Sequence, residues 1–140
     1  MAFIASVESM ADAKGKAAGT GHCVALVQKL IPSIGSTSMW KPGVVLAKKS
    51  NVNPTITLGT AIATFVDKKY ENTTGGRSHA AIFIRFTSNG IVVFDQWKGQ
   101  VAAERTIEYR GADECKPPRP GDNRFCRWSN DADRFFVIEH

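Results

Sequence analysis

Apolar residues recur at helical spacing in one short stretch near the beginning of the chain. Four residues fall at positions i, i+3, i+4 and i+7 and share one helix face: Cys23, Leu26, Val27 and Leu30. Thr20 is the predicted N-cap of this helix, and Pro32 and Gly35 follow as residues that end it. Residues 1–19 mix small and charged side chains and are predicted to form an N-terminal arm with one short helix.

Apolar runs of strand length fill much of the remaining chain. The ranges predicted as strands are 60–66, 79–86, 91–97 and 134–139. Asn89-Gly90 between two of these runs predicts a hairpin. Residues 36–58, with a turn at 40–43, and residues 67–78 are predicted to be loops, the first one wrapping the surface. A helix followed by an antiparallel meander predicts an α+β fold, and 140 residues suit a single domain, 1–140.

The chain has a net positive charge, and its basic residues are scattered along the sequence. The formal net charge of +5 would favour an anionic partner, yet the basic residues form only pairs such as Lys48-Lys49. Without a basic run interleaved with aromatics we expect no nucleic-acid partner and interpret the charge as a solvated surface. The first eight residues lack a positive n-region, and no stretch approaches the ~20 apolar residues of a membrane span. We therefore expect synthesis in the cytoplasm without a signal peptide and no membrane insertion.

Cys23 is the candidate nucleophile. The unpaired amides and positive end of a helix N-terminus lower a thiol pKa, and Cys23 stands at the head of the predicted helix. Gly21 lets the backbone approach a substrate carbonyl, and the Cys23 amide can face a developing oxyanion. The alternative is that Cys23 is a small buried hydrophobe of a core helix.

His79 is the candidate base. It opens an apolar strand, and the small residues Ala80 and Ala81 leave room for a helix head to pack beside it. An imidazole there can hold the thiolate as an ion pair and later protonate a leaving amine. His22 is the rival, but adjacent helical residues point ~100° apart, so we expect His22 at the rim or in a capping role.

A polar residue on the next strand is expected to orient His79 through its second ring nitrogen. That strand ends in Asp95-Gln96-Trp97. A two-residue hairpin loop would put Gln96 on the face of His79, whereas an odd loop or a bulge would put Asp95 there. We favour Asp95, because a carboxylate in an apolar strand needs a partner more than an amide does. Gln96, Gly21 and Trp97 are candidates for substrate or oxyanion contacts, although core packing is favoured for Trp97 and Trp40.

The remaining histidines and cysteines indicate no further catalytic or metal site. No His or Cys pair has the spacing of a zinc site, so we expect neither a metal nor an organic cofactor. Cys115 and Cys126 flank a proline-rich loop, and either a disulfide or two unpaired thiols fits this spacing.

Several motifs resemble those of known amidases. Residues 21–28 (GHCVALVQ), 76–83 (GRSHAAIF) and 90–97 (GIVVFDQW) resemble the cysteine helix, the histidine strand and the next strand of the CHAP and NlpC class of papain-like amidases. With residues 40–43 (WKPG) and 59–65 (GTAIATF), the chain is similar to small amidase effectors delivered by type VI secretion systems.

The resemblance implies a papain-like fold and a role for each candidate residue. Cys23 would be the nucleophile of a peptidoglycan amidase with a thioester intermediate, His79 the base, and Asp95 the orienter, where CHAP domains more often have Glu or Asn. It also implies export by a secretion apparatus, action on stem peptides or cross-links in the periplasm of a competing Gram-negative cell, and a cognate immunity protein. A Cys115–Cys126 bridge would then form only after delivery.

Two other functions are compatible with the same residues. One is a cysteine hydrolase, deamidase or acyltransferase toxin that acts on a protein with the same three residues. The other is a non-catalytic domain of the same fold that binds the cell wall or a partner.

Overall fold

A six-stranded antiparallel sheet forms the body of the protein in the computed structural model, which describes residues 2–47, 55–73, 76–111 and 128–140. The strands lie in the order β1-β6-β2-β3-β4-β5. Their bounds are β1 (Lys41–Val45), β2 (Ala61–Thr64), β3 (Ala80–Phe86), β4 (Gly90–Trp97), β5 (Gln100–Glu108) and β6 (Phe135–Glu139). The last strand of the chain thus lies between β1 and β2 and joins β1 to the rest of the sheet.

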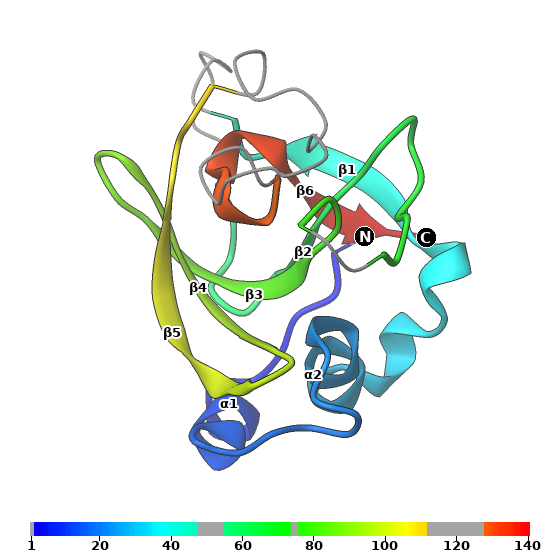
Figure 1. Cartoon of the computed structure of the whole chain (residues 1–140), viewed down its shortest axis with the longest axis vertical. Coiled ribbons are helices and arrows are strands. Elements are labelled where there is room, and N and C mark those ends of the chain that lie inside the picture. Colours follow the sequence, from blue (N-terminus) through cyan, green and yellow to red (C-terminus); the bar gives the residue numbers. More distant parts are fainter. Residues whose placement is uncertain (1, 48–54, 74–75, 112–127) are drawn as a thin grey trace.

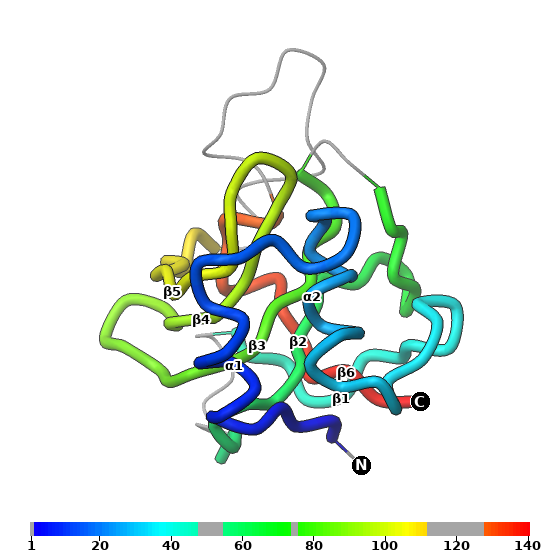
Figure 2. The backbone as a smooth tube through the Cα atoms, turned by 90° about the horizontal axis from the view of Figure 1, so that it is seen from below, coloured from blue at the N-terminus to red at the C-terminus, as the bar shows by residue number. Residues whose placement is uncertain are grey.

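Two helices cover one face of this sheet, α1 (Val7–Ala13) and α2 (Cys23–Leu30). Figure 1 shows both helices on the same side of the curved strands, and Figure 2 shows them in front of the sheet. The described residues also form short 3-10 turns: η1 (Pro32–Ile34), η2 (Thr37–Met39), η4 (Trp128–Asn130) and η5 (Ala132–Arg134). The predicted α+β architecture, with the cysteine-bearing helix packed on an antiparallel sheet, is confirmed, and no described helix is long and apolar enough to cross a membrane.

The centre of the sheet is buried on both faces. On the helix side, Leu26 and Val27 of α2 pack with Ala80 and Ile82 of β3. On the opposite side, the core residues are Leu46, Ile62, Ala81, Phe83, Ile91, Val93, Ile107, Ala132, Phe135 and Val137. Burial on both faces explains why the sequence of the central strands is almost continuously apolar.

The helix α2 begins three residues later than the predicted cap. Its N-cap is His22 and not Thr20. Gly21 has a φ of +88°, a left-handed conformation that ends any helical path from Thr20 and that glycine adopts without strain. The prediction of Thr20 as N-cap is therefore wrong, and the consequence is that Cys23 is the first helical residue.

Two edge strands were not expected. Residues 41–43, predicted as a turn within a surface loop, belong to β1, where Pro42 is tolerated because an edge strand does not need every N–H. The other edge strand, β5, buries only Ala102 and Ile107 of its nine residues. Its sequence therefore lacks the alternation of apolar and polar residues that would have predicted a strand.

A β-bulge sets the register between β3 and β4. Phe86 pairs with Ile91 and Arg85 with Val92, but Phe83 then pairs with Val93, so one extra residue of β3 is left between the pairs. The bulge moves every earlier residue of β3 to the other face relative to β4. As a result Asp95, and not Gln96, faces His79.

Candidate active site

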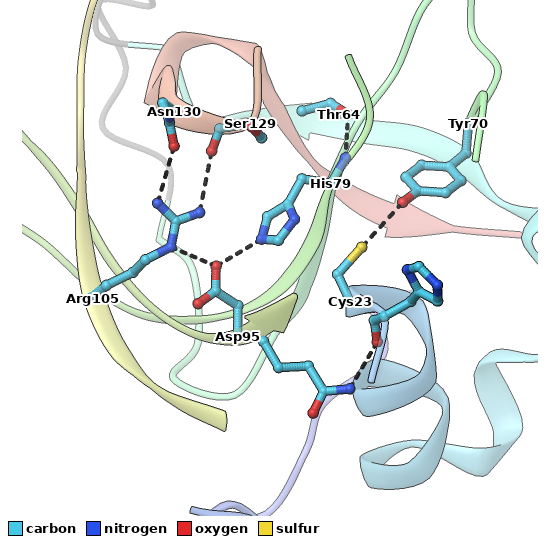
Figure 3. A network of polar contacts seen from close by, with 10 residues as sticks. Cys23, Thr64, Tyr70, His79, Asp95, Arg105, Ser129 and Asn130 are labelled. Atoms are coloured by element: carbon cyan, nitrogen blue, oxygen red, sulfur yellow. Dashed lines mark hydrogen bonds and ion pairs between the residues drawn. The ribbon is translucent and has the colours of Figure 1, made fainter. Parts of the chain in front are cut away.

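Cys23 stands at the edge of a cleft of about 370 Å³. It is the first residue of α2 and is partly buried against the helix-side core. Its Sγ lies 3.6 Å from the hydroxyl of Tyr70. Figure 3 shows the sulfur facing the imidazole of His79. The first turn of a helix leaves its amides without intrahelical partners, so Cys23 adjoins a site suited to negative charge.

His79 is held at the beginning of β3 by the neighbouring strand. Its backbone N–H donates to Thr64 Oγ1 at 3.0 Å, and its carbonyl accepts from the Thr64 N–H at 3.0 Å. Its Nε2 lies 2.7 Å from Asp95 Oδ2, which leaves the other ring nitrogen for Cys23 (Figure 3). The imidazole is therefore fixed between a carboxylate and a thiol, and both partners face it from different elements.

The pKa values of Cys23 and His79 are shifted in opposite directions, so that the thiol becomes the stronger acid of the two. Burial raises the pKa of the Cys23 thiol, but the hydrogen bond and positive charge of His79, with smaller contributions from the Ala80 amide and Tyr70, lower it to about 7. Burial lowers the pKa of His79, but the hydrogen bonds to Asp95 and Cys23 and their negative charges raise it to about 9. Between pH 7 and 9 the pair is accordingly a thiolate and an imidazolium, the reactive form of a cysteine nucleophile.

Tyr70 is a residue of the site that the sequence did not indicate. It follows a tight turn in which Val66 and Lys69 exchange backbone hydrogen bonds, and its ring lies 5.1 Å from that of Trp40. Burial and the neighbouring charge of Cys23 raise the pKa of Tyr70, so its hydroxyl stays protonated. It can then donate to the sulfur or to an oxyanion formed beside the sulfur.

Asp95 is buried and shared between two donors. Its Oδ2 accepts from His79 Nε2 at 2.7 Å and from Arg105 Nε at 2.8 Å. Arg105 comes from strand β5, which was not predicted from the sequence, so this contact was not expected either. The contact between His79 and Asp95 is the one expected if a bulge, and not a regular two-residue hairpin, joins the two strands.

Gln96 points to the other side of β4 and does not reach the cleft. Its Oε1 accepts from the Ala18 N–H at 2.8 Å, and its Nε2 donates to the carbonyls of Ala18 at 2.9 Å and His22 at 2.8 Å. Both amide protons are thus used within the protein. The expected substrate or oxyanion contact of Gln96 is wrong, and the buried amide instead fixes the chain just before Cys23.

Replacing Gln96 by alanine should destabilise the fold. The substitution leaves the buried Ala18 N–H without a partner and removes one of the two hydrogen bonds that the Ala18 and His22 carbonyls each accept, so we expect the free energy of unfolding to fall by about 3 kcal/mol in urea denaturation. Gln28→Ala is the matched control, because its amide bonds only the Gly35 carbonyl at the surface. Equal losses in the two variants would contradict the role assigned to Gln96.

The remaining candidates divide between the cleft and the core. Trp97 and His22 line the cleft, and Trp97 is 43% exposed, so the expectation that Trp97 packs in the core is wrong. Trp40 is buried and its Nε1 donates to the Ile34 carbonyl at 3.1 Å, as core packing predicts. Gly21 is buried and shapes the turn before α2.

Two further predictions concern the Cys115–Cys126 pair and metal binding. Cys115 and Cys126 lie outside the described residues, so their pairing stays a prediction. Within the described ranges, no three side chains of His, Cys, Asp or Glu gather as metal ligands do.

Comparisons with known proteins place the chain in a family. The sequence model of the family described as Domesticated amidase effector 2 matches residues 2–138. A Type VI secretion amidase effector 2 protein of Salmonella typhi is 34% identical over 122 residues, 86% of this chain and 87% of that protein. A Domesticated amidase effector 2 of Ixodes scapularis is 40% identical over 106 residues, which cover 73% and 67% of the two chains.

A solved structure shares the fold. The Type 6 secretion amidase effector 2 structure has a TM-score of 0.73 and 30% identity, and the match covers 97% of this chain and 95% of that one. The helix with Cys23 on an antiparallel sheet therefore belongs to a papain-like hydrolase, as the resemblance implied. The chain is a member of the domesticated amidase effector 2 family, and it is an amidase.

Proposed function

We propose that this amidase hydrolyses amide bonds in the stem peptides or cross-links of peptidoglycan, with Cys23 as nucleophile, His79 as acid and base and Asp95 as the residue that orients His79. The observation that carries the proposal is the continuous series of contacts through Cys23, His79 and Asp95 at the wall of the cleft. The names of the relatives, amidase effectors, support the reaction class.

Acylation begins from the ion pair. The Cys23 thiolate attacks the carbonyl carbon of the scissile amide, and the carbonyl oxygen becomes an oxyanion beside the first turn of α2. The Tyr70 hydroxyl is the second donor near that position. The His79 imidazolium gives its proton to the leaving nitrogen as the carbon–nitrogen bond breaks, which leaves a thioester on Cys23 and a free amine.

Hydrolysis of the thioester returns the site to its first state. Neutral His79 takes a proton from a water molecule, and the resulting hydroxide attacks the thioester carbonyl. Breaking the carbon–sulfur bond releases a carboxylic acid and restores the thiolate. Asp95 stabilises the imidazolium in both steps without changing its own protonation. One water is consumed per bond, and no cofactor takes part.

The charge of the cleft suits an acidic substrate. Among the described residues that line it, the ionisable ones beyond the cysteine and His79 are His22, Lys98 and Arg105, and none is acidic. Stem peptides carry free carboxylates, so long-range attraction would favour their approach. This agrees with peptidoglycan as the substrate class.

The pH dependence of the reaction should be bell-shaped. Below about pH 7 the thiol of Cys23 is protonated, and above about pH 9 His79 has no proton for the leaving amine. We therefore expect kcat/KM to rise to a plateau near pH 8 and to fall on either side, with limbs near 7 and 9. Initial rates on solubilised peptidoglycan across pH 5–10 test this expectation. A profile that rises only above pH 9 would contradict the ion pair.

The biological setting belongs to the same proposal. As an effector of a type VI secretion system, the protein would pass from the cytoplasm of one cell into a target cell and act in the periplasm of a Gram-negative competitor. A cognate immunity protein would protect the producer. The support is the name of the Salmonella typhi relative, which covers most of this chain.

Digestion of purified sacculi tests the proposed reaction. The protein alone, without added metal or cofactor, should release peptide fragments, and mass spectrometry should show one added water for each cleaved bond. Fragment masses also identify which bond is cut. Intact sacculi after prolonged incubation, together with release of ammonia from a protein substrate, would favour a deamidase instead.

A further inference from the structure

Arg105 lies where it can act on the pair of His79 and Asp95 without touching His79. On β5, Ala103 pairs with Asp95 of β4, and Arg105 is two residues beyond Ala103 on the same face. Its Nε donates to Asp95 Oδ2 at 2.8 Å, the same oxygen that lies 2.7 Å from His79 Nε2. One carboxylate oxygen therefore joins the guanidinium and the imidazole.

The guanidinium of Arg105 is held from the side away from Asp95. Nη1 donates to Asn130 Oδ1 and Nη2 to the Ser129 carbonyl, both at 3.3 Å, and its Cζ lies 5.0 Å from the centre of the Trp97 ring. Figure 3 shows this fork between η4 and Asp95. Because Arg105 has these other anchors, it fixes the direction of the carboxylate.

Among the four charged groups Cys23, His79, Asp95 and Arg105, the charges balance only when Arg105 is included. The groups that face one another are Cys23 of α2, Tyr70 after the turn at 66–69, His79 before β3, Asp95 of β4 and Arg105 of β5, with His22 and Lys98 lining the same cleft. In the reactive form the thiolate and carboxylate are balanced by the imidazolium and guanidinium. Without the guanidinium the buried set has one excess negative charge and binds protons more tightly.

We propose that Arg105 is a positioning residue of the amidase, which directs Asp95 Oδ2 to His79 and whose charge keeps Cys23 ionised at neutral pH. The effect on turnover rests on the proposed function. The effect on the ionisation of Cys23 does not, so the two can be tested separately.

The test measures both effects in Arg105→Met, which removes the charge, and Arg105→Lys, which keeps it. The rate of Cys23 alkylation by iodoacetamide, followed by mass spectrometry of the peptide that contains Cys23, gives the pH midpoint of ionisation without any substrate. We expect the midpoint to rise by about one pH unit in Arg105→Met and to stay unchanged in Arg105→Lys. On peptidoglycan, kcat should fall about 10- to 100-fold in Arg105→Met, with partial rescue by lysine.

The matched control is Arg85→Met, since Arg85 on β3 is exposed and lies 4.0 Å from Glu104. It should leave the midpoint and kcat unchanged. Arg105→Gln replaces the methionine variant if circular dichroism shows that the latter is unfolded. An unchanged midpoint in a folded uncharged variant, a rise in KM alone, or unfolding of both uncharged variants would overturn the proposal. Failure of the wild type to cut peptidoglycan would contradict the proposed function but would leave the predicted shift in the pH midpoint of Cys23 ionisation unaffected.

Discussion

Replacing Cys23 by alanine is expected to abolish the release of peptide fragments from sacculi while the protein stays folded. In the proposed mechanism the Cys23 sulfur is the only protein atom that forms a bond to the substrate's carbonyl carbon. Its loss should therefore reduce the rate by about 10⁴-fold or more. The substituted side chain is small and only partly buried, so the free energy of unfolding should change little. Fragment release by mass spectrometry and thermal unfolding give the two readouts.

Cys23→Ser makes the comparison sharper, because serine keeps a hydroxyl of similar size but has no thiolate at neutral pH. It should be as inactive as the alanine variant. Both variants retain Cys115 and Cys126, so the loss cannot be assigned to thiols in general. Activity within tenfold of the wild type in either variant would be incompatible with a thioester intermediate.

The second large effect is expected for Asp95→Asn. Asparagine has nearly the same shape but no charge, and the negative charge and hydrogen bond of Asp95 are causes of the raised pKa of His79. Without them the imidazolium is less stable, and the amide can present either its oxygen or its nitrogen to the ring. We expect kcat/KM to fall about 10²- to 10⁴-fold, measured by initial rates on solubilised peptidoglycan.

Asp12→Asn is the control for this substitution. Asp12 is exposed on α1, so the loss of its charge should leave kcat/KM unchanged. In Asp95→Asn the alkaline limb of the pH profile should also move below 9, because His79 loses its proton more readily. Wild-type kcat/KM with an unmoved alkaline limb would show that Asp95 does not orient His79.

The central part of the fold could be predicted because its physical signals are local. The i, i+3, i+4 spacing after Cys23 predicted α2, and the Asn89-Gly90 turn between two apolar runs predicted the β3 and β4 hairpin. Together these elements place Cys23 next to His79. The α+β class follows from the same two signals.

The parts that were missed depend on contacts distant in the sequence. The bulge between Phe83 and Arg85 decides whether Asp95 or Gln96 faces His79, and no residue type marks it, so only the cost of burying a carboxylate favoured Asp95. Arg105 and Tyr70 were missed for a similar reason. Each reaches the site from a segment without a strong pattern, one from an edge strand and one from a loop.

Gln96 was predicted to belong to the substrate site but has a structural role. A polar residue beside the predicted site looked like a substrate ligand, although its amide is satisfied by the backbone of Ala18 and His22. A sequence does not reveal that a segment 74 residues earlier needs those hydrogen bonds. The buried amide holds the turn that carries Cys23, so Gln96 serves the site through the backbone.

The pH dependence of Cys23 alkylation in the wild type and in His79→Ala tests the ion pair most directly. We predict that the wild-type thiol reacts with a midpoint near pH 7 and that the midpoint in His79→Ala moves upward, because the hydrogen bond and charge that lower the pKa of Cys23 come chiefly from His79. A wild-type midpoint at or above that of an ordinary cysteine, or one that His79→Ala leaves unchanged, would contradict the account.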